Sequence, residues 1–545
     1  MADEQAPWPQ PEDIMAAFFA HGQPEALFGR PVRAGPHRAA CSEAAATPSR
    51  DAKLGVLLNR ASPPTVSSHA VTTPRSSACP GLLRIVPARD GGICRIKLPG
   101  GALSAAQARA VADASARHAN GVVELSNRAN LQLRGVRSGH EAALSAALIR
   151  AGLGPASALS SAHPDAPADP TALSRADDIR NVMISPAAGR DPHALIDTAP
   201  LCGELLTLLQ NDARFAALSP KFALLLDGGE QLAQVDHPHD VWLAASPDGA
   251  SGRFVFGLAG CPGSAGATAS NSTHANTGEP CDANGTGALA AVPPPRVPAL
   301  VRGLLHTFLD LAAADATRMR DLLATHSADA LLRHAQRYVD FPLARDASLR
   351  HWQRHIPADA SLRLGAHAQR GDGTWYVGGQ APLGRIDAAT LRDLAALAQT
   401  HGNGMLHATP WQSVLLPDIA TQAVSTVLAK LSALGLACDP AQAITHVIAC
   451  AGSAGCAKGL ADTKTDALQL AECLPAGVDV HLTGCPRSCA AAHRAPYTLL
   501  AAAPGRYDLY RRDGGPGFGQ CVAPQLTIDE AAALLARLAR STSHA

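Results

Sequence analysis

A segment in the first half of the chain recurs in the second half, 283 positions later, and no other feature constrains the fold as strongly. At this offset the helical pattern and the strand pattern that follows it align without a gap. A repeat of this length indicates a duplicated supersecondary unit, because each copy has the same apolar surface to bury. The matching positions are Gly101, Ala105, Ala106, His118, Asn120 and Gly121, against Gly384, Ala388, Ala389, His401, Asn403 and Gly404.

The repeated unit has the hydrophobic periodicity of short strands placed around a helix. Pro99-Gly100-Gly101 predicts a turn, and Ser104 is placed to cap the alanine-rich helix that follows. Stretches of alternating apolar and polar residues predict the strands. We expect strands at 82–86, 93–98, 122–125 and 131–133, and helices at 104–118 and 139–151.

The segments that follow the two copies also resemble each other, at an offset near 265. Asn181-Val-Met-Ile184 matches His446-Val-Ile-Ala449, and both have the composition of a buried strand. In nearly the same register, Leu218-Ser-Pro-Lys221 falls on Leu482-Thr-Gly-Cys485. This alignment predicts that the first half carries Lys221 where the second half carries a cysteine.

Four cysteines form two closely spaced pairs near the end of the chain, in the patterns C-x5-C and C-x3-C. The small residues around them let the backbone approach a bulky inorganic group, and ligation by four thiolates is typical of an iron–sulfur cube. A disulfide is disfavoured because no secretory signal is visible, and the C-x2-4-C spacing of zinc sites fits only the second pair. We predict that a 4Fe-4S cluster is bound by Cys450, Cys456, Cys485 and Cys489.

The other nine cysteines show no paired spacing, and we interpret them as buried or incidental thiols. A metal clip formed by Cys261 and Cys281 is a weaker alternative, since no further ligand accompanies them. The remaining members of this set are Cys41, Cys79, Cys94, Cys202, Cys438, Cys473 and Cys521.

The charge balance points to no polyanionic partner. The 545 residues include 46 Lys and Arg and 46 Asp and Glu, so no overall charge attracts nucleic acid. The first residues lead into no apolar signal core, and no run of about eighteen apolar residues occurs. We therefore expect a cytoplasmic protein that contacts neither membranes nor nucleic acid.

Six basic side chains of the first half are candidates for binding an acidic ligand. Guanidinium groups bind carboxylates through two parallel hydrogen bonds, so a row of them suits a ligand with many acid groups. A solvated strand edge protected by charge is the alternative. The duplication favours the functional interpretation, because the second copy has Trp411 in place of Arg128. The candidates are Arg95, Lys97, Arg128, Arg134, Arg180 and Lys221.

These motifs resemble the nitrite and sulfite reductase family, which is built around siroheme and a four-iron cluster. The resemblance extends from about Cys79 to Arg540 and implies a tetrapyrrole held between the halves, against the cluster. It also implies that Arg95 or Lys97, with Arg128, Arg180 and Lys221, lines this tetrapyrrole and its small ligand. The segments that carry it, besides the cysteine pairs, are Arg95-Ile-Lys-Leu-Pro-Gly-Gly101, Asn127-Arg-x-x-Leu-Gln132, Asp178-Ile-Arg-Asn-Val182 and Pro220-Lys-Phe222.

The resemblance and the duplication together predict an α+β fold of two ferredoxin-like repeats and two larger α/β lobes. Residues 1–78 and 262–295 are rich in small and polar residues and proline, so we expect them to lie outside the packed cores. The predicted parts are a low-complexity N-terminal extension (1–78), repeat 1 (79–152), lobe 1 (153–335) with a disordered insertion (262–295), repeat 2 (336–440) and lobe 2 with the cysteines (441–545).

One position departs from the reductases of the family. They usually carry a second basic residue after the lysine–phenylalanine pair, and here that residue is Ala223, which disfavours reduction of a small anion. Residues 79–86, 92–101 and 178–189 are most similar to the precorrin-3B synthase branch. Its substrate, precorrin-3A, is a near relative of siroheme without iron. The resemblance thus implies that the macrocycle is a substrate and not a cofactor.

The reaction implied is an oxygen-dependent hydroxylation of precorrin-3A at C20 with closure of a γ-lactone, drawing electrons from NADH. Dioxygen must be activated by a donor of single electrons, and a cluster with four cysteine ligands has no obvious open site. A mononuclear non-haem iron would close this gap. Asp236-His-Pro-His-Asp240 is the densest set of candidate ligands, although a polar hairpin between strands 221–226 and 241–244 is the favoured interpretation.

No glycine-rich dinucleotide motif follows a strand, so we expect a separate reductase or ferredoxin to deliver the electrons. His118 and His401 recur at helix ends, where capping or packing explains them.

Two other functions stay open. One is a siroheme-dependent sulfite or nitrite reductase, in which Cys489 would bridge the cluster and the siroheme iron. The other is a non-catalytic tetrapyrrole-binding or iron–sulfur sensor protein.

Overall fold

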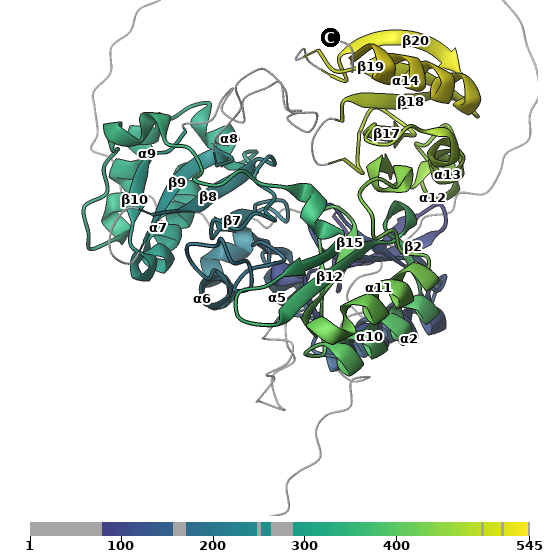
Figure 1. The fold of residues 1–545 in the computed structure, drawn as a ribbon. Coiled ribbons are helices and arrows are strands. Elements are labelled where there is room, and N and C mark those ends of the chain that lie inside the picture. The colour runs from purple at the N-terminus through teal and green to yellow at the C-terminus, as the bar shows by residue number, and fades with distance from the viewer. Residues whose placement is uncertain are drawn as a thin grey trace, which may run out of the picture.

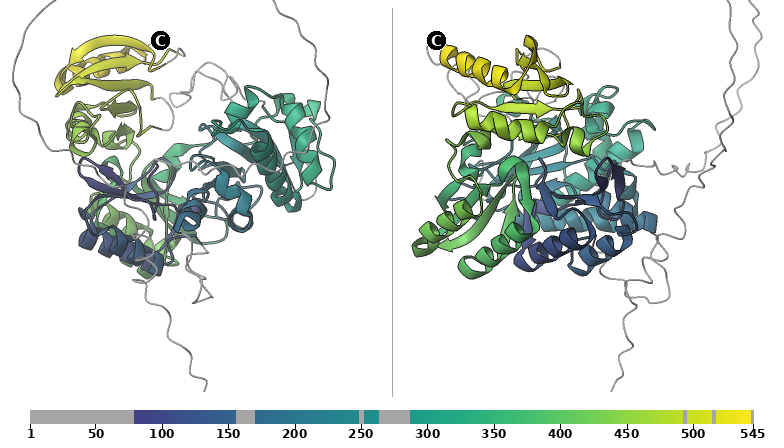
Figure 2. Two further views of the ribbon diagram at one scale, coloured as in Figure 1. Left: turned by 180° about the vertical axis from the view of Figure 1, so that it is seen from behind. Right: turned by 90° about the vertical axis from the view of Figure 1, so that its right-hand side faces the viewer.

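The computed structural model describes residues 79–155, 170–247, 252–262, 287–491, 495–513 and 517–542. The extension predicted over 1–78 and most of the predicted insertion lie outside these ranges. Within them, no helix combines the length and the apolar character needed to cross a membrane. Four five-stranded sheets organise the described chain, and the paired repeats carry two lobes that extend in different directions (Figures 1 and 2).

Two of the sheets belong to the repeats, and each repeat gives one strand to the sheet of the other. β3 of the first copy pairs with β14, and β13 of the second copy pairs with β4, antiparallel in both cases. Neither sheet is complete without the donated strand. The first sheet contains β1 (Val86–Ala88), β2 (Gly91–Ile96), β5 (Leu131–Val136), β4 (Val122–Leu125) and β13 (Arg385–Asp387) in this order; the second contains β11 (Gly365–Ala368), β12 (Thr374–Gln380), β15 (Ser413–Ala420), β14 (Met405–Ala408) and β3 (Ala102–Ser104).

The offset of 283 residues holds element by element, which confirms the predicted duplication. α2 (Ala105–His118) and α10 (Ala388–His401) correspond residue for residue, as do α3 (Glu141–Arg150) and α11 (Val424–Ala433). α2 packs against α10. Figure 1 shows α2, α10 and α11 on the face of the joined sheets that is turned away from lobe 2, so the other face is left for the lobes.

The turn that precedes each central helix is also repeated. Gly101 and Gly384 have φ of 70° and 69°, the left-handed region that favours glycine. Ser104 and Asp387 then each accept a hydrogen bond from a backbone amide in the first helical turn. A Cβ at Gly101 would collide with the carbonyl oxygen of Ala408 in the other copy. Glycine is therefore required where the two copies approach most closely.

The other two sheets form the lobes, and both have the same topology. In each, the first three strands run parallel and the last two run antiparallel to their neighbours, which confirms the predicted α/β lobes. Lobe 1 contains β6 (Val182–Met183), α6 (Ala199–Asn211), β7 (Leu224–Asp227), β8 (His239–Ser246), β9 (Arg253–Gly260), β10 (Ala290–Val292) and α7 (Val297–Leu311). Lobe 2 contains β16 (Val447–Ala449), α13 (Thr463–Cys473), β17 (Val480–Thr483), β18 (Tyr497–Ala503), β19 (Arg506–Arg511), β20 (Gln520–Leu526) and α14 (Ile528–Thr542). Four shorter α-helices are α5 (Pro170–Asp178), α8 (Met319–Leu323), α9 (Ala328–Ala335) and α12 (Gly452–Gly455).

The topology of the lobes shows that the predicted alignment of Lys221 with Cys485 is wrong. β6 and β16 do correspond, but the connection that leads to β7 (184–223) is longer than the one that leads to β17 (450–479). Lys221 therefore precedes β7, whereas Cys485 follows β17. The counterpart of the second cysteine pair is the turn after β7, which contains Glu230.

Three smaller predictions for lobe 1 are also wrong. The expected hairpin around 236–240 does not form, because β7 and β8 run parallel and His239 already lies in β8. The end of the predicted insertion contains β10, which pairs with β9 and lies next to the buried Leu289. Cys261, interpreted as a thiol, is disulfide-bonded.

An arginine from the segment between lobe 1 and repeat 2 fills the turn after β7. Arg354 pairs with Asp227 through Nε–Oδ2 and Nη2–Oδ1 distances of 2.7 and 2.9 Å, and both side chains are 1% exposed. Arg354 also donates to the carbonyl oxygens of Glu230 and Ile356. Burial and then the neighbouring Asp227 raise the pKa of Glu230 to about 8, so this carboxyl is mostly protonated at pH 7. The turn after β7, which corresponds to the second cysteine loop, is thus filled by the buried ion pair of Asp227 and Arg354.

Replacement of Arg354 by methionine is expected to lower the free energy of unfolding by about 3–5 kcal/mol, because it leaves a buried carboxylate without its cation. Urea unfolding followed by tryptophan fluorescence measures the effect. Arg350→Met, at an exposed position four residues earlier, serves as the control and should change the value by less than about 0.5 kcal/mol. Equal stability of the two variants would contradict the buried pair.

Candidate iron–sulfur and anion-binding site

The two cysteine pairs meet at the carboxyl ends of two parallel strands of lobe 2. Cys450 follows β16 and Cys456 follows α12, while Cys485 and Cys489 follow β17. β16 and β17 are parallel neighbours, so their carboxyl ends lie at the same edge of the sheet. The amide of Cys450 donates to the carbonyl oxygen of Leu482 at 3.2 Å and ties the first loop to the second.

The surroundings of Cys450 suit a thiolate ligand. Its sulfur accepts hydrogen bonds from the backbone amides of Gly452 and Gly484 at 3.4 and 3.2 Å, and the hydroxyl of Thr463 lies 3.5 Å away. Donors of this kind stabilise a thiolate and help to set the reduction potential of an iron–sulfur cluster. A Cβ at Gly459 would lie 2.5 Å from the backbone of Gly452, so glycine permits the chain to fold back closely around the sulfur.

The other three cysteines share this neighbourhood. Burial raises the pKa of the Cys489 thiol, and Cys485, Cys450 and Cys456 raise it further, as expected for acids that approach one another. Across the described ranges, no three His, Cys, Asp or Glu side chains meet as the ligands of one metal ion do. A four-iron cube binds each cysteine to a different iron, so its ligating sulfurs stand farther apart than those around a single ion. Four thiolates from two neighbouring loops are the donor set of such a cube.

Basic residues of repeat 1 and of the segment before β6 lie in one electrostatic group. Lys97 is 4% exposed, and its ammonium group donates to the carbonyl oxygen of Asp178. Burial lowers the pKa of Lys97 to about 8; Asp177 and Asp178 act in the opposite direction, whereas Arg128 and Arg180 lower it further. Arg180 pairs with Asp177 at 3.3 Å. The structure thus brings together three of the predicted cations.

Arg128 carries a charge that no described residue neutralises by direct contact. Its backbone amide forms a hydrogen bond, but its guanidinium makes no hydrogen bond or ion pair within the described chain. Burial lowers the pKa of Arg128 to about 10, and Arg318 and Arg95 lower it further. Arg95 binds Gln132 at 3.0 Å and is influenced by the charge of Cys489, so the group extends to the cysteines. A half-buried, unpaired guanidinium favours binding of an anion.

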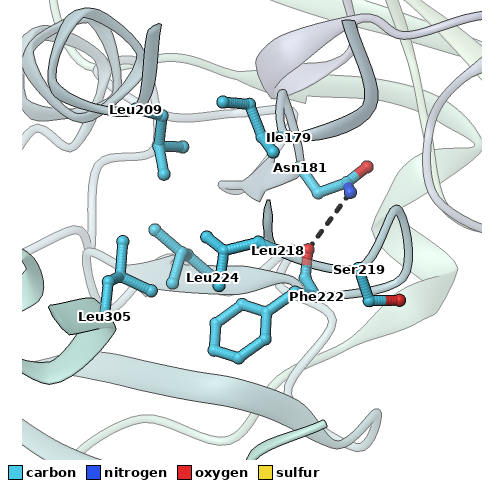
Figure 3. A pocket seen from close by; sticks show the side chains of 8 residues that line it. All are labelled: Ile179, Asn181, Leu209, Leu218, Ser219, Phe222, Leu224 and Leu305. Atoms are coloured by element: carbon cyan, nitrogen blue, oxygen red, sulfur yellow. Dashed lines mark hydrogen bonds between the residues drawn. The ribbon is translucent and has the colours of Figure 1, made fainter. Parts of the chain in front are cut away.

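Lys221 stands apart from this group because its side chain is exposed. Asn181 donates to the carbonyl oxygens of Pro220 and Phe222 at 2.8 and 3.1 Å, so the backbone on either side of Lys221 lies beside Arg180. Figure 3 shows the amide of Asn181 reaching Phe222 in a hollow that is lined mostly by apolar side chains. Its free volume of about 10 Å³ suffices for about one water molecule and excludes a macrocycle.

Arg134, predicted to bind a tetrapyrrole, uses its guanidinium in another way. It pairs with Asp90 and donates to the carbonyl oxygen of Gly455, in the loop between the first two cysteines. These contacts support a role at the cysteine loop, and its role at a tetrapyrrole stays a prediction.

Sequence reasoning missed Arg318, and it considered Asp240 only as a candidate iron ligand and not as the partner of an arginine. Asp240 is 1% exposed and accepts hydrogen bonds from Arg318 at 2.9 Å and from the amides of Ala223 and Met319 at 2.9 and 2.7 Å. An acid at the start of the otherwise apolar stretch that forms β8 was the available signal for Asp240. No spacing marks Arg318, which only the fold brings near Arg128.

The two histidines considered as iron ligands show no preformed ligand set. The rings of His237 and His239 meet edge to face with centroids 5.2 Å apart. Burial, His237 and Arg128 hold the pKa of His239 well below its usual range, so this ring is neutral. In the part of the chain that the structure describes, no carboxylate completes a group of three with them. A mononuclear iron at this place finds no support in the geometry.

Two protein-family models match the chain. The nitrite/sulfite reductase ferredoxin-like half domain matches residues 86–151 and 367–434, which are the two repeats. The nitrite and sulphite reductase 4Fe-4S domain matches residues 175–343, which form lobe 1 and the segment after it. The four cysteines lie beyond these matches, so their assignment depends on the loops of lobe 2 themselves.

Individual relatives fall into two groups. The chloroplastic ferredoxin–nitrite reductase of Zea mays is 28% identical over 417 residues, or 72% of this chain and 67% of its own length. A precorrin-3B synthase of a Sinorhizobium species is 27% identical over 490 residues, or 89% of this chain and 93% of its own. Among solved structures, the Mycobacterium tuberculosis NirA protein matches with a TM-score of 0.62 at 20% identity, covering 82% of this chain and 80% of its own, which shows a shared fold.

Cys485→Ser is expected to lose most of its bound iron, because a serine oxygen is a poor substitute for a thiolate ligand. Iron and acid-labile sulfide per chain, determined after anaerobic purification, measure the loss. Cys521→Ser is the control, since Cys521 is an exposed free cysteine in β20 of the same lobe. Equal iron content in both variants would refute the ligand assignment.

Proposed function

The chain belongs to the nitrite and sulfite reductase family, and from this premise we propose that it is a precorrin-3B synthase. Such an enzyme hydroxylates precorrin-3A at C20 with dioxygen and closes a γ-lactone with the ring A acetate, a step of aerobic cobalamin synthesis. The observation that carries the proposal is the correspondence with the Sinorhizobium synthase over nearly the whole length of both chains. The maize nitrite reductase, in contrast, extends well beyond its aligned part.

The charges around Arg128 support a ligand with several carboxylates. Arg95 and Arg318 both lie within electrostatic range of Arg128 and lower its pKa, and Asp240 acts in the opposite direction. The acetate and propionate groups of a precorrin would supply the missing negative charge, and guanidinium groups bind carboxylates bidentately. Recognition of the substrate would thus rest on the face of repeat 1 and on the side of lobe 1 that adjoins it.

Ala223 supports a macrocyclic substrate over a small inorganic anion. Its side chain is 3% exposed and its amide is held by Asp240, so this position offers a buried methyl group in place of an ammonium group. With Lys221 exposed as well, the Lys221–Ala223 segment contributes no cation to the group around Arg128. Reduction of nitrite or sulfite needs positive charge close to the anion, which this segment does not provide.

The cluster would be held by Cys450, Cys456, Cys485 and Cys489, and when bound it supplies single electrons. Hydroxylation consumes two external electrons, because one oxygen atom enters the macrocycle and the other leaves as water. We infer an external donor of the ferredoxin or NADH–reductase type, in line with the ferredoxin dependence that the names of the nitrite reductases state. Arg95, which lies within electrostatic range of both Cys489 and Arg128, would keep the macrocycle close to the cysteine loops.

A siroheme-dependent nitrite or sulfite reductase is the second candidate function. The observation that favours it is the unpaired guanidinium of Arg128, which would bind a small anion as well as a carboxylate. In that case siroheme would be a resident cofactor, and the purified protein would show it.

Incubation of the anaerobically purified protein with precorrin-3A, dioxygen, NADH and a ferredoxin–reductase pair tests the proposal. We expect an oxygen-dependent product whose mass increases by one oxygen atom, labelled from ¹⁸O₂, and a brown protein without siroheme bands. A Soret band with strong absorption in the red, together with nitrite or sulfite reduction, would establish the second candidate. Absence of both activities would favour a non-catalytic binding protein.

Arg128→Met is expected to weaken binding of uroporphyrin III, a stable polycarboxylate porphyrin, by about tenfold or more, because a charge-assisted contact is lost. The free energy of unfolding should change by less than about 0.5 kcal/mol, since no partner within the described chain is left behind. Fluorescence titration and urea unfolding measure the two effects. Arg150→Met, an exposed position at the end of α3, is the control. A marked loss of stability without loss of binding would contradict the assignment.

A further inference from the structure

Two arginines of repeat 1 hold the backbone of the first cysteine loop. Arg134, from β5, is 8% exposed and binds both oxygens of Asp90, with Nε and Nη2 at 2.9 and 2.8 Å. Its Nη2 also donates to the carbonyl oxygen of Gly455 at 2.6 Å. Arg89, in the turn between β1 and β2, donates to the carbonyl oxygen of Ser453 at 3.0 Å. Repeat 1 therefore contacts the loop just before Cys456.

The contact with Arg134 fixes the peptide group that leads into Cys456. The carbonyl of Gly455 and the amide of Cys456 belong to the same planar unit. Arg134 donates to the oxygen of this unit, the Gly455 carbonyl. The N–H of the unit, on Cys456, donates to the carbonyl oxygen of Gly452 at 2.9 Å. Because both ends of this unit are held, the direction in which the Cys456 side chain leaves the backbone is restricted. A Cβ at Gly455 would lie 2.6 Å from Nη2 of Arg134, so the contact also requires glycine there.

The duplication supplies an internal comparison for this contact. At the offset of 283, Asp90 and Arg134 correspond to Gly373 and Pro417, and neither of these can form an ion pair. The charged pair is thus present in repeat 1, the copy whose arginine contacts the cysteine loop. A pair needed only to stabilise a ferredoxin-like repeat would have no reason to be confined to one copy.

We propose that Arg134, fixed in place by Asp90, is a positioning residue for the cluster-binding loop and not a ligand of the macrocycle. The proposal rests on the cluster site of the proposed function and adds a residue that acts on it from another domain. Nε and Nη2 of Arg134 both donate to the carboxylate of Asp90. Nη2 donates in addition to the carbonyl oxygen of Gly455. Loss of the arginine would also leave the charge of Asp90 beside the loop, which makes reduction of a cluster less favourable.

Arg134→Gln and Arg134→Lys test this role when three properties of the anaerobic protein are measured. These are the rate at which a chelator removes iron, the midpoint potential of the cluster in a spectroscopic titration, and the affinity for uroporphyrin III. Arg137→Gln is the control, because Arg137 follows the same strand but donates to the carbonyl oxygens of Ala116 and Arg117, away from the loop.

For Arg134→Gln we expect iron removal to accelerate about tenfold or more and the midpoint potential to fall, with affinity for uroporphyrin III unchanged within about twofold. Arg134→Lys, which keeps the charge but lacks the fork, should fall between Gln and wild type. The proposal would be overturned if a folded variant bound uroporphyrin III more weakly while its rate of iron removal and its midpoint potential were unchanged. Arg134 would then be assigned to the macrocycle site. Failure of the wild-type chain to hydroxylate precorrin-3A would count against the proposed function alone, because iron removal is measured without substrate.

Discussion

The exchange of β3 and β13 between the two repeats is the constraint on which the rest of the structure depends. Each donated strand completes the sheet of the other copy, so the two sheets are fixed relative to each other by backbone hydrogen bonds. The packing of α2 against α10 closes one face of this unit. The remaining face therefore adjoins both lobes, and residues distant in the sequence meet there. The hydrogen bond from Arg134 of repeat 1 to the carbonyl oxygen of Gly455 in lobe 2 is one consequence of this arrangement.

The duplicated halves have diverged so that one site is built from unequal parts. After β17 the chain carries cysteines, whereas the corresponding turn after β7 is occupied by the buried pair of Asp227 and Arg354. On the repeats, Arg128 has Trp411 as its counterpart, and the Asp90–Arg134 pair has no charged counterpart. The two halves therefore contribute different groups: lobe 2 carries the two cysteine pairs, and the first half carries the basic residues around Arg128.

Much of the fold could be predicted from the sequence because the repeated helices have strong periodicity and clear caps. The offset found from a few matching residues, such as Gly101 and Gly384, holds for whole elements. The strand exchange could not be predicted, since β3 and β13 have three residues each and no periodicity reveals their partners. The alignment of Lys221 with Cys485 failed because insertions between strands break a fixed offset.

The cysteine pairs could be located from spacing alone, because each pair follows one of two adjacent strands and its members stay close in the sequence. The cationic side is different, since its members come from β2, the turn after β4 and the start of α8, and only tertiary structure unites them. Asp240, which holds Arg318 and the amide of Ala223 together, illustrates this point. A single acid in an apolar strand carries no information about its partners.

We expect lobe 2 to hold an iron–sulfur cluster and lobe 1, despite its equal topology, to hold none. Anomalous scattering at the iron edge, measured from crystals of the anaerobically purified protein, locates any bound iron. We predict one compact iron peak enclosed by Cys450, Cys456, Cys485 and Cys489, and no iron at the turn after β7. Iron at Asp227 and Glu230, or no iron between the cysteines, would contradict this prediction.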